Sequence, residues 1–193
     1  MIQMIGLVLI AVLAENLVLI QPIGMGWPKD TIMGQKQALR MGCSLTLVMT
    51  ATSLTTWLLN TLVLRYFGLE HLRVLVYVLA VLGVVRLLRF VLARVFPALS
   101  RQLDESLSET VFNCAVLGVA LIGTLRSYNL LQSVVHAFAG GIGVLIVLVN
   151  LAGLQDQASF DKCPKLFRGL PIQLITAGLM ALALMGFVGL NVR

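Results

Sequence analysis

The sequence has little charge and none of the motifs with which a chain binds a nucleotide on its own. Charged residues make up 11% of its 193 residues, against 59% hydrophobic residues. It contains no glycine-rich phosphate loop, no dinucleotide fingerprint, no histidine-rich metal motif and no Ser-His-Asp arrangement. These absences exclude a chain that binds NADH or flavin by itself. We therefore expect no catalytic activity from the chain alone.

Cysteine is also scarce. The three cysteines, an odd number, lie in or near apolar segments, so a disulfide framework is not expected. Cys43 lies in an apolar run beside Ser44, and we interpret it as a small packing residue. Cys163 stands in a polar loop and has no assigned role. Cys114 follows Asn113 within an apolar stretch, and it is the cysteine whose surroundings need an explanation.

Long apolar runs dominate the rest of the chain. The mean hydropathy of +0.99 is too high for a soluble domain of this length and predicts an all-α integral membrane protein. One span needs about 20 apolar residues. The pattern predicts six transmembrane helices, over residues 4–24, 38–64, 72–96, 110–125, 130–154 and 170–190. We interpret the first as a retained span, because it has no Lys or Arg ahead of its apolar run and no small-residue cleavage site after it.

Basic residues are distributed unequally between the two sides of the predicted bundle. The loops after the first, third and fifth helices, with the adjoining helix ends, hold ten Lys and Arg residues, and the other side holds four. The positive-inside rule places the richer side in the cytoplasm, so both termini are predicted on the non-cytoplasmic side. The net charge of +6 thus indicates orientation and not nucleic-acid binding.

The chain divides near Pro97 into two halves of three predicted helices each, about 1–97 and 98–193, within a single membrane domain. Halves with an odd number of spans run in opposite directions through the membrane, which is the arrangement of inverted repeats. The first helix of each half carries a polar interruption, at Glu15-Asn16 and at Asn113-Cys114. We therefore predict broken half-helices in the first and fourth segments that meet at mid-membrane.

These polar side chains are functional candidates, because polar groups in hydrocarbon are costly unless they find partners. We expect the Asn16 and Asn113 amides to bond the backbone groups that broken helices leave free. Glu15 must be protonated, paired or hydrated at that depth, so it is either an ion-path residue or the partner of an arginine in another subunit. We interpret His136 as a hydrogen-bonded core histidine, with a proton relay as the alternative.

Four stretches of the sequence resemble one known family. They are ENLVL followed by IGM within residues 15–25, NCAVLGVAL at 113–121, LITAGLM at 174–180 and MGF at 185–187. These stretches are similar to the family of A subunits of Rnf electron-transport complexes, which is related to the E subunit of the sodium-pumping NADH:quinone reductase (Nqr). The resemblance covers essentially the whole chain, including the six spans and the orientation of the termini.

The resemblance implies a membrane subunit of an ion-translocating oxidoreductase complex in a bacterial cytoplasmic (inner) membrane. In that family, electron transfer is coupled to the movement of Na⁺ or H⁺. The A subunit pairs there with a homologous, Rnf E-like membrane subunit of opposite orientation. Each of the two supplies two cysteines, one from each broken helix, to a 2Fe-2S cluster buried between them. The cluster passes electrons across the membrane between the flavin and iron–sulfur subunits of the complex.

Carried over by resemblance, Cys114 matches the cluster ligand of the second half. The first-half ligand follows a Leu-Gly-x-Cys pattern in the family, whereas this chain has Ile-Gly-Met-Gly, with Gly26 in the cysteine position. Residues 104–110, just before Cys114, are also polar where the family has an apolar run. Such a cluster takes four thiolates, so either a partner supplies a third ligand or the cluster is absent or altered. Cys43 would replace Gly26 only if its helix faced the interface, and Cys114 is otherwise a small packing residue.

Three hypotheses follow for the function. The leading one is a membrane protein like the Rnf A subunits, which helps to carry electrons across the membrane in a multisubunit complex. The second is a divergent paralogue without a cluster, which serves as a structural or ion-path scaffold. The third is a small secondary transporter, because inverted repeats with broken helices also describe transporters.

Overall fold

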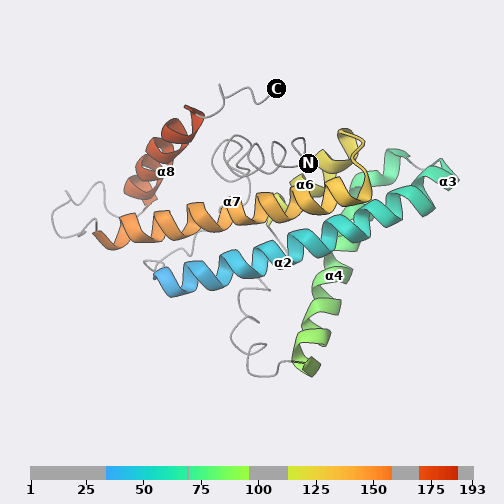
Figure 1. Cartoon of the computed structure of the whole chain (residues 1–193), viewed down its shortest axis with the longest axis horizontal. Coiled ribbons are helices and arrows are strands. Elements are labelled where there is room, and N and C mark those ends of the chain that lie inside the picture. Colours follow the sequence, from blue (N-terminus) through green and yellow to red (C-terminus); the bar gives the residue numbers. More distant parts are fainter. Residues whose placement is uncertain (1–33, 69, 96–112, 158–169, 187–193) are drawn as a thin grey trace.

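The computed structural model describes residues 34–68, 70–95, 113–157 and 170–186, and the regular structure in these ranges is entirely helical (Figure 1). The prediction of an all-α chain is confirmed for this part of the sequence. The first predicted helix lies outside the described residues, and with it Glu15, Asn16 and Gly26. Nothing in the structure therefore tests the roles predicted for these three positions.

The first described helix, α2 (Gln35–Leu59), continues through a π-helical turn, η2 (Asn60–Leu64), into the short α3 (Arg65–Phe67). Gly68 ends this run with a φ of 65°, a left-handed conformation that glycine adopts without steric cost. A 3₁₀ turn, η3 (Glu70–Leu72), then leads into α4 (Arg73–Val95).

The second half of the chain begins with the short α6 (Cys114–Leu125), which is followed by α7 (Leu130–Gln157) and α8 (Leu170–Met185). Three stretches are long and apolar enough to cross a membrane: Gln35–Leu64, Arg73–Arg94 and Leu130–Leu154. The helices predicted over 38–64, 72–96 and 130–154 are thereby confirmed. The helices predicted over 110–125 and 170–190 appear as shorter apolar helices.

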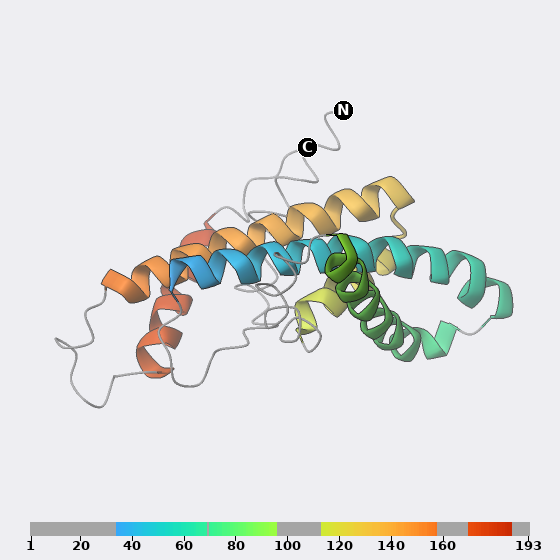
Figure 2. The ribbon, with the colours of Figure 1, turned by 90° about the horizontal axis from the view of Figure 1, so that it is seen from below.

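The two longest helices, α2 and α7, lie side by side and antiparallel (Figures 1 and 2). The turn between α6 and α7 folds α6 back against α7, and α6 also contacts α2 and α4. The α4 helix crosses α2 steeply, and α8 contacts α7 (Figure 1). The arrangement makes α2 the central helix of the described part, with packed neighbours on several sides.

Small residues allow α2 and α7 to approach closely. A Cβ atom added to Gly141 on α7 would lie 2.8 Å from the Thr46 Cα on α2. A Cβ added to Gly42 on α2 would lie 2.9 Å from the Leu145 Cγ on α7. Real Cβ atoms do not come so near, so a larger side chain at either glycine would push the helices apart. Close approach at small residues is the usual means by which membrane helices gain van der Waals contact.

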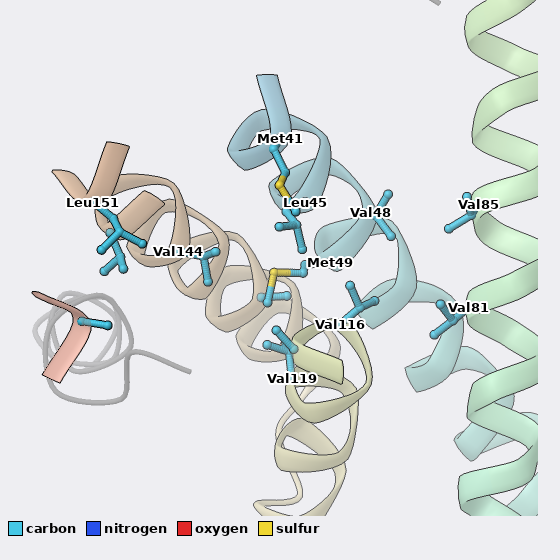
Figure 3. Packing of buried hydrophobic residues seen from close by; sticks show 14 residues of the cluster. Met41, Leu45, Val48, Met49, Val81, Val85, Val116, Val119, Val144 and Leu151 are labelled. Carbon is cyan, nitrogen blue, oxygen red and sulfur yellow. The ribbon is translucent and has the colours of Figure 1, made fainter. Parts of the chain in front are cut away.

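The core between these helices is aliphatic. In Figure 3, Val48 and Met49 of α2 lie beside Val116 of α6, and Val81 of α4 points toward the same region. All of them are buried. Other members of the same cluster come from α2, α4, α6, α7 and α8: Met41, Leu45, Val85, Ala115, Val119, Ala137, Val144, Val147, Leu151 and Ala177. The core thus joins the two halves of the chain into one packed unit.

Candidate functional site at the start of α6

The α6 helix begins at Asn113, whose side chain caps it. Asn113 has an extended backbone (φ −80°, ψ 111°), and its Oδ1 accepts a hydrogen bond from the Ala115 backbone N–H at 2.9 Å. The Val116 N–H donates to the Asn113 carbonyl oxygen at 3.1 Å. Asparagine is among the best residues for this position. Because Asn113 is only 7% exposed, its amide satisfies a backbone donor that lies away from water.

The start of α6 and the middle of α7 are equally far along their helices from the place where the two helices approach each other. At the other end of α6, a Cβ added to Gly123 would lie 3.0 Å from the Ser133 Oγ on α7. Asn113 stands ten residues before Gly123, and Gly143 stands ten residues after Ser133. Both distances correspond to about 15 Å of helix. The 12 residues of α6 span about 18 Å, which is well short of the roughly 30 Å hydrocarbon core.

Cys114 is exposed at this helix start. The next two residues, Ala115 and Val116, turn into the core, and both are at most 1% exposed. Its neighbours fill the core in its place, and the interpretation of Cys114 as a packing residue stays a prediction. Cys43 is likewise exposed, so its interpretation as a packing residue is wrong for the part of the chain that the structure describes.

Cys43 lies on the opposite face of α2 from the core that holds α6. Cys43 lies roughly half a turn around α2 from Leu45 and Val48, at about 100° per residue. Those two residues belong to the core that holds α6, whereas Cys43 shares its face of α2 with the exposed Leu47. Among the described residues there is no group of three or more His, Cys, Asp and Glu side chains that could hold a metal ion.

Sequence reasoning missed a set of hydroxyl contacts near the far end of α6. The Ser53 hydroxyl on α2 donates to the Ser133 carbonyl oxygen on α7 at 3.0 Å, and the two Oγ atoms lie 2.9 Å apart. The hydroxyl oxygens of Tyr77 on α4 and Thr124 on α6 lie 2.7 Å apart. The density of Ser and Thr on α2 was the available signal. We refer to these two hydroxyl pairs, Ser53–Ser133 and Tyr77–Thr124, as the hydroxyl layer.

The hydroxyl layer has aromatic groups at its side. The Trp57 Nε1–H donates to the Tyr128 carbonyl oxygen at 3.1 Å, which ties α2 to the turn before α7. The Tyr128 ring meets the His136 ring edge-on, with 5.5 Å between centroids. His136 is 3% exposed. This burial agrees with a core histidine, whereas a role in proton transfer stays a prediction.

Comparison with known proteins identifies the family of the chain. The family model described as "Rnf-Nqr subunit, membrane protein" matches residues 4–191. A protein from Syntrophotalea carbinolica is 39% identical over 180 residues, and one from Serratia proteamaculans is 40% identical over 179 residues. A third, from Yersinia enterocolitica, is 38% identical over 179 residues. Each alignment covers 93% of both chains, and each relative is named as the A subunit of an ion-translocating oxidoreductase complex. The predicted resemblance is confirmed, and the chain belongs to the Rnf-Nqr family of membrane subunits.

Proposed function

We propose that this chain is the A-type membrane subunit of an ion-translocating oxidoreductase complex, within which electron transfer drives Na⁺ or H⁺ across the membrane. The observation that carries the proposal is identity of 38–40% over 93% of the chain to relatives that bear this name. The three long apolar helices agree with a membrane-embedded role. The same similarity argues against the isolated secondary transporter, since the relatives are named as subunits of a complex.

The proposed location is the bacterial cytoplasmic membrane, with both termini on the non-cytoplasmic side. The distribution of basic residues supports this orientation, and it stays unequal, nine against four, when Arg86 within α4 is left out of the count. The proposed partners are a homologous membrane subunit of opposite orientation and the flavin and iron–sulfur subunits of the complex. The chain's lack of nucleotide-binding motifs supports a dependence on such partners.

The proposed architecture is six helices in two inverted repeats, and the contact between α2 and α7 supports it. Gly42 of α2 faces Leu145 of α7, and Gly141 of α7 faces Thr46 of α2. In each helix the residue that meets the opposite glycine stands four positions after the helix's own glycine. A two-fold axis between equivalent antiparallel helices produces this reciprocal relation, in which each partner offers the same contact to the other. The helices α2 and α7 are the second spans of their respective halves, as inverted repeats require.

The residues of this chain do not fit the two-cysteine contribution that the family resemblance implies for a 2Fe-2S cluster. Cys114 is exposed at the start of α6 and is sterically available as a thiolate ligand. The position expected for its counterpart is Gly26, which has no donor atom. Cys43 lies on the opposite face of α2 from the core residues that hold α6, which argues against it as the replacement. Four ligands for such a cluster would require three from the partner.

The presence of Gly26 where the resemblance implies a cysteine favours a second candidate function. In this alternative the chain is a paralogue without a cluster that acts as a structural or ion-path scaffold. Both functions place the chain in the same complex, and they differ in whether electrons pass beside Cys114. Asn113 holds the start of α6 in either case, because its cap is made within the chain.

Purification of the complex through a tag on this chain tests the proposal. We expect flavin- and iron–sulfur-binding subunits to co-purify, and a chain that purifies with no other subunit would contradict the proposed function. Iron analysis and EPR spectra of the same complex, with and without Cys114→Ser, then separate the two candidates. A 2Fe-2S signal lost only in Cys114→Ser supports ligation through Cys114. A complex without such a signal supports the scaffold.

A further inference from the structure

The uninterrupted apolar stretch of α4 is too short to cross the membrane. Residues 74–85 are twelve apolar or small residues, which as a helix span about 18 Å of a hydrocarbon core about 30 Å thick. A helix that enters the core at Arg73 leaves it about 20 residues later, near Arg94. Arg86 then lies about 12 Å inside the hydrocarbon from the Arg94 end. A guanidinium at this depth requires a counter-charge or a hydrated cavity.

Arg86 has neither within the described part of the chain. Its side chain is exposed on the surface of α4, and it makes no hydrogen bond or ion pair with the residues that the structure describes. The α4 helix itself carries no acidic residue. Helical side chains lean toward the N-terminus of their helix. Arg86 therefore leans toward the middle of the membrane, away from the nearer lipid headgroups, and snorkelling to a lipid phosphate is disfavoured.

Arg86 belongs to a stripe along one face of α4, made of Leu79, Gly83, Arg86 and Phe90. At about 100° per residue these positions fall within an arc of roughly 60°. Leu79 and Phe90 are more than half exposed. A Cβ added to Gly83 would meet nothing within 4 Å, so the space beside this small residue, at the centre of the stripe, is open. We refer to these four residues as the α4 stripe.

An exposed glycine beside an intramembrane arginine has the features of a helix–helix interface. Small residues let a second helix approach the backbone, and charged side chains within membranes face a protein interior where they are paired. Among the described residues Arg86 faces away from the core, and we take the helix that completes this interior to belong to another polypeptide. A carboxylate is the matching group, since it accepts two hydrogen bonds from one guanidinium.

We propose that the α4 stripe binds a transmembrane helix of another subunit of the complex, and that a carboxylate on that helix pairs with Arg86. This inference rests on the proposed function, because it needs a multisubunit complex. Gly83 admits the partner helix, Phe90 and Leu79 pack against it, and the ion pair fixes its register. Phe90 also holds the Arg94 guanidinium 5.4 Å from its ring centroid, which leaves Arg86 as the cation nearest the centre of the stripe.

The test measures how much of each other subunit co-purifies with the tagged chain in mild detergent. Arg86→Glu places two carboxylates together, and we expect co-purification of at least one membrane subunit to fall roughly tenfold or more. Arg86→Lys keeps the positive charge, and we expect this variant to retain most of the co-purification. Arg65→Glu is the matched control, because Arg65 is an exposed arginine outside the stripe. Unchanged co-purification in Arg86→Glu would overturn the inference while the wild-type complex still upheld the proposed function.

Photo-crosslinking keeps the test independent of any folding defect. A benzophenone amino acid in place of Phe90 is expected to form an adduct with the membrane subunit whose co-purification falls in Arg86→Glu. The control position is Leu58, which is exposed on α2 and should give no adduct with it. Changing the carboxylate nearest the adduct to Lys should restore assembly of Arg86→Glu. Adducts to lipid alone or to a second copy of this chain, or failure of the charge swap, would overturn the inference.

A second set of variants tests whether Arg86 pairs with a carboxylate of its own chain. The chain's own candidates for the counter-charge are Glu15, in the first predicted helix, and Asp104, Glu105 and Glu109, which follow α4 in the sequence. Their combined replacement by the corresponding amides should leave co-purification unchanged. A loss equal to that of Arg86→Glu would show that the counter-charge comes from this chain, and the inference would fall.

Discussion

The contact between α2 and α7 is built differently along its length. Toward one end, Gly42 and Gly141 bring the two backbones together, and each glycine receives a side chain from the opposite helix. Toward the other end, Ser53 and Ser133 join the helices through their hydroxyls. We call these the glycine end and the hydroxyl end. The first depends on shape and the second on hydrogen bonds.

The difference matters because a bilayer provides no hydrophobic force between two apolar helices. Lipid tails are as apolar as leucine, so association depends on close packing and on interhelical hydrogen bonds. A hydrogen bond in this setting contributes on average about 0.6 kcal/mol, because the separated helices also find partners. Overpacking a tight contact costs about 1–3 kcal/mol. We therefore expect the glycine end to contribute more to the stability of the subunit than the hydroxyl end.

Gly141→Val gives the largest expected effect. A Cβ at this position would lie 2.8 Å from the Thr46 Cα, and because a backbone atom cannot rotate away, the helices must separate. We expect the free energy of unfolding in detergent to fall by about 1–3 kcal/mol. The measurement is the unfolding midpoint in SDS–detergent mixtures, followed by tryptophan fluorescence.

Gly178→Val is the matched control for this change. Gly178 lies in α8, and a Cβ there would meet nothing within 4 Å. Both variants lose a helical glycine and gain the same side chain, so their difference isolates the contact with Thr46. Equal unfolding midpoints for the two variants would contradict the assignment of the glycine end as the stronger contact.

Asn113→Ala tests a hydrogen bond far from the hydroxyl end. Its effect on the free energy of unfolding is compared with that of a hydrogen bond within the hydroxyl end. The variant removes the Oδ1 that accepts from the Ala115 N–H, which leaves a buried donor unsatisfied. Loss of such a cap costs about 0.5–2 kcal/mol. Asn150→Ala is the control, because its Nδ2 donates only to the Ile146 carbonyl oxygen of its own helix, at an exposed position. A loss no larger than that of Asn150→Ala would show that the cap does not hold the start of α6.

The long helices and the start of α6 were predictable from the sequence because each has a strong local signal. A long, mainly apolar run over residues 38–64, whose polar residues are mostly Ser and Thr, predicts a helix whatever its neighbours are, and the structure has Gln35–Leu64 as one span. Asn113 interrupts an apolar run, and it stands at the first residue before α6. Both signals lie within a few residues of the feature that they predict.

The direction in which each residue faces was not predictable. Apolar and small polar residues are spread over all sides of α2, so its sequence does not distinguish the core face with Met49 from the exposed face with Cys43. The predicted packing of Cys43 failed for this reason. The pairing of Ser53 with Ser133 joins residues 80 positions apart, and such a contact depends on how two finished helices dock. For the same reason, the exposure of Gly83 was not predictable from the sequence.

The double-mutant cycle of Ser53→Ala and Ser133→Ala gives the smallest expected effect and completes the comparison. The coupling energy between the two hydroxyls should be about 0.6 kcal/mol, and no more than about 1.7 kcal/mol. Ser53→Ala should cost more than Ser133→Ala, because the Ser53 hydroxyl also donates to the Ser133 carbonyl oxygen at 3.0 Å. Thr55→Ala is the control, since its hydroxyl bonds only the Ala51 carbonyl oxygen of its own helix. A coupling energy above the loss measured for Gly141→Val would reverse the ranking of the two ends, and hydrogen bonding would then be the stronger link between α2 and α7.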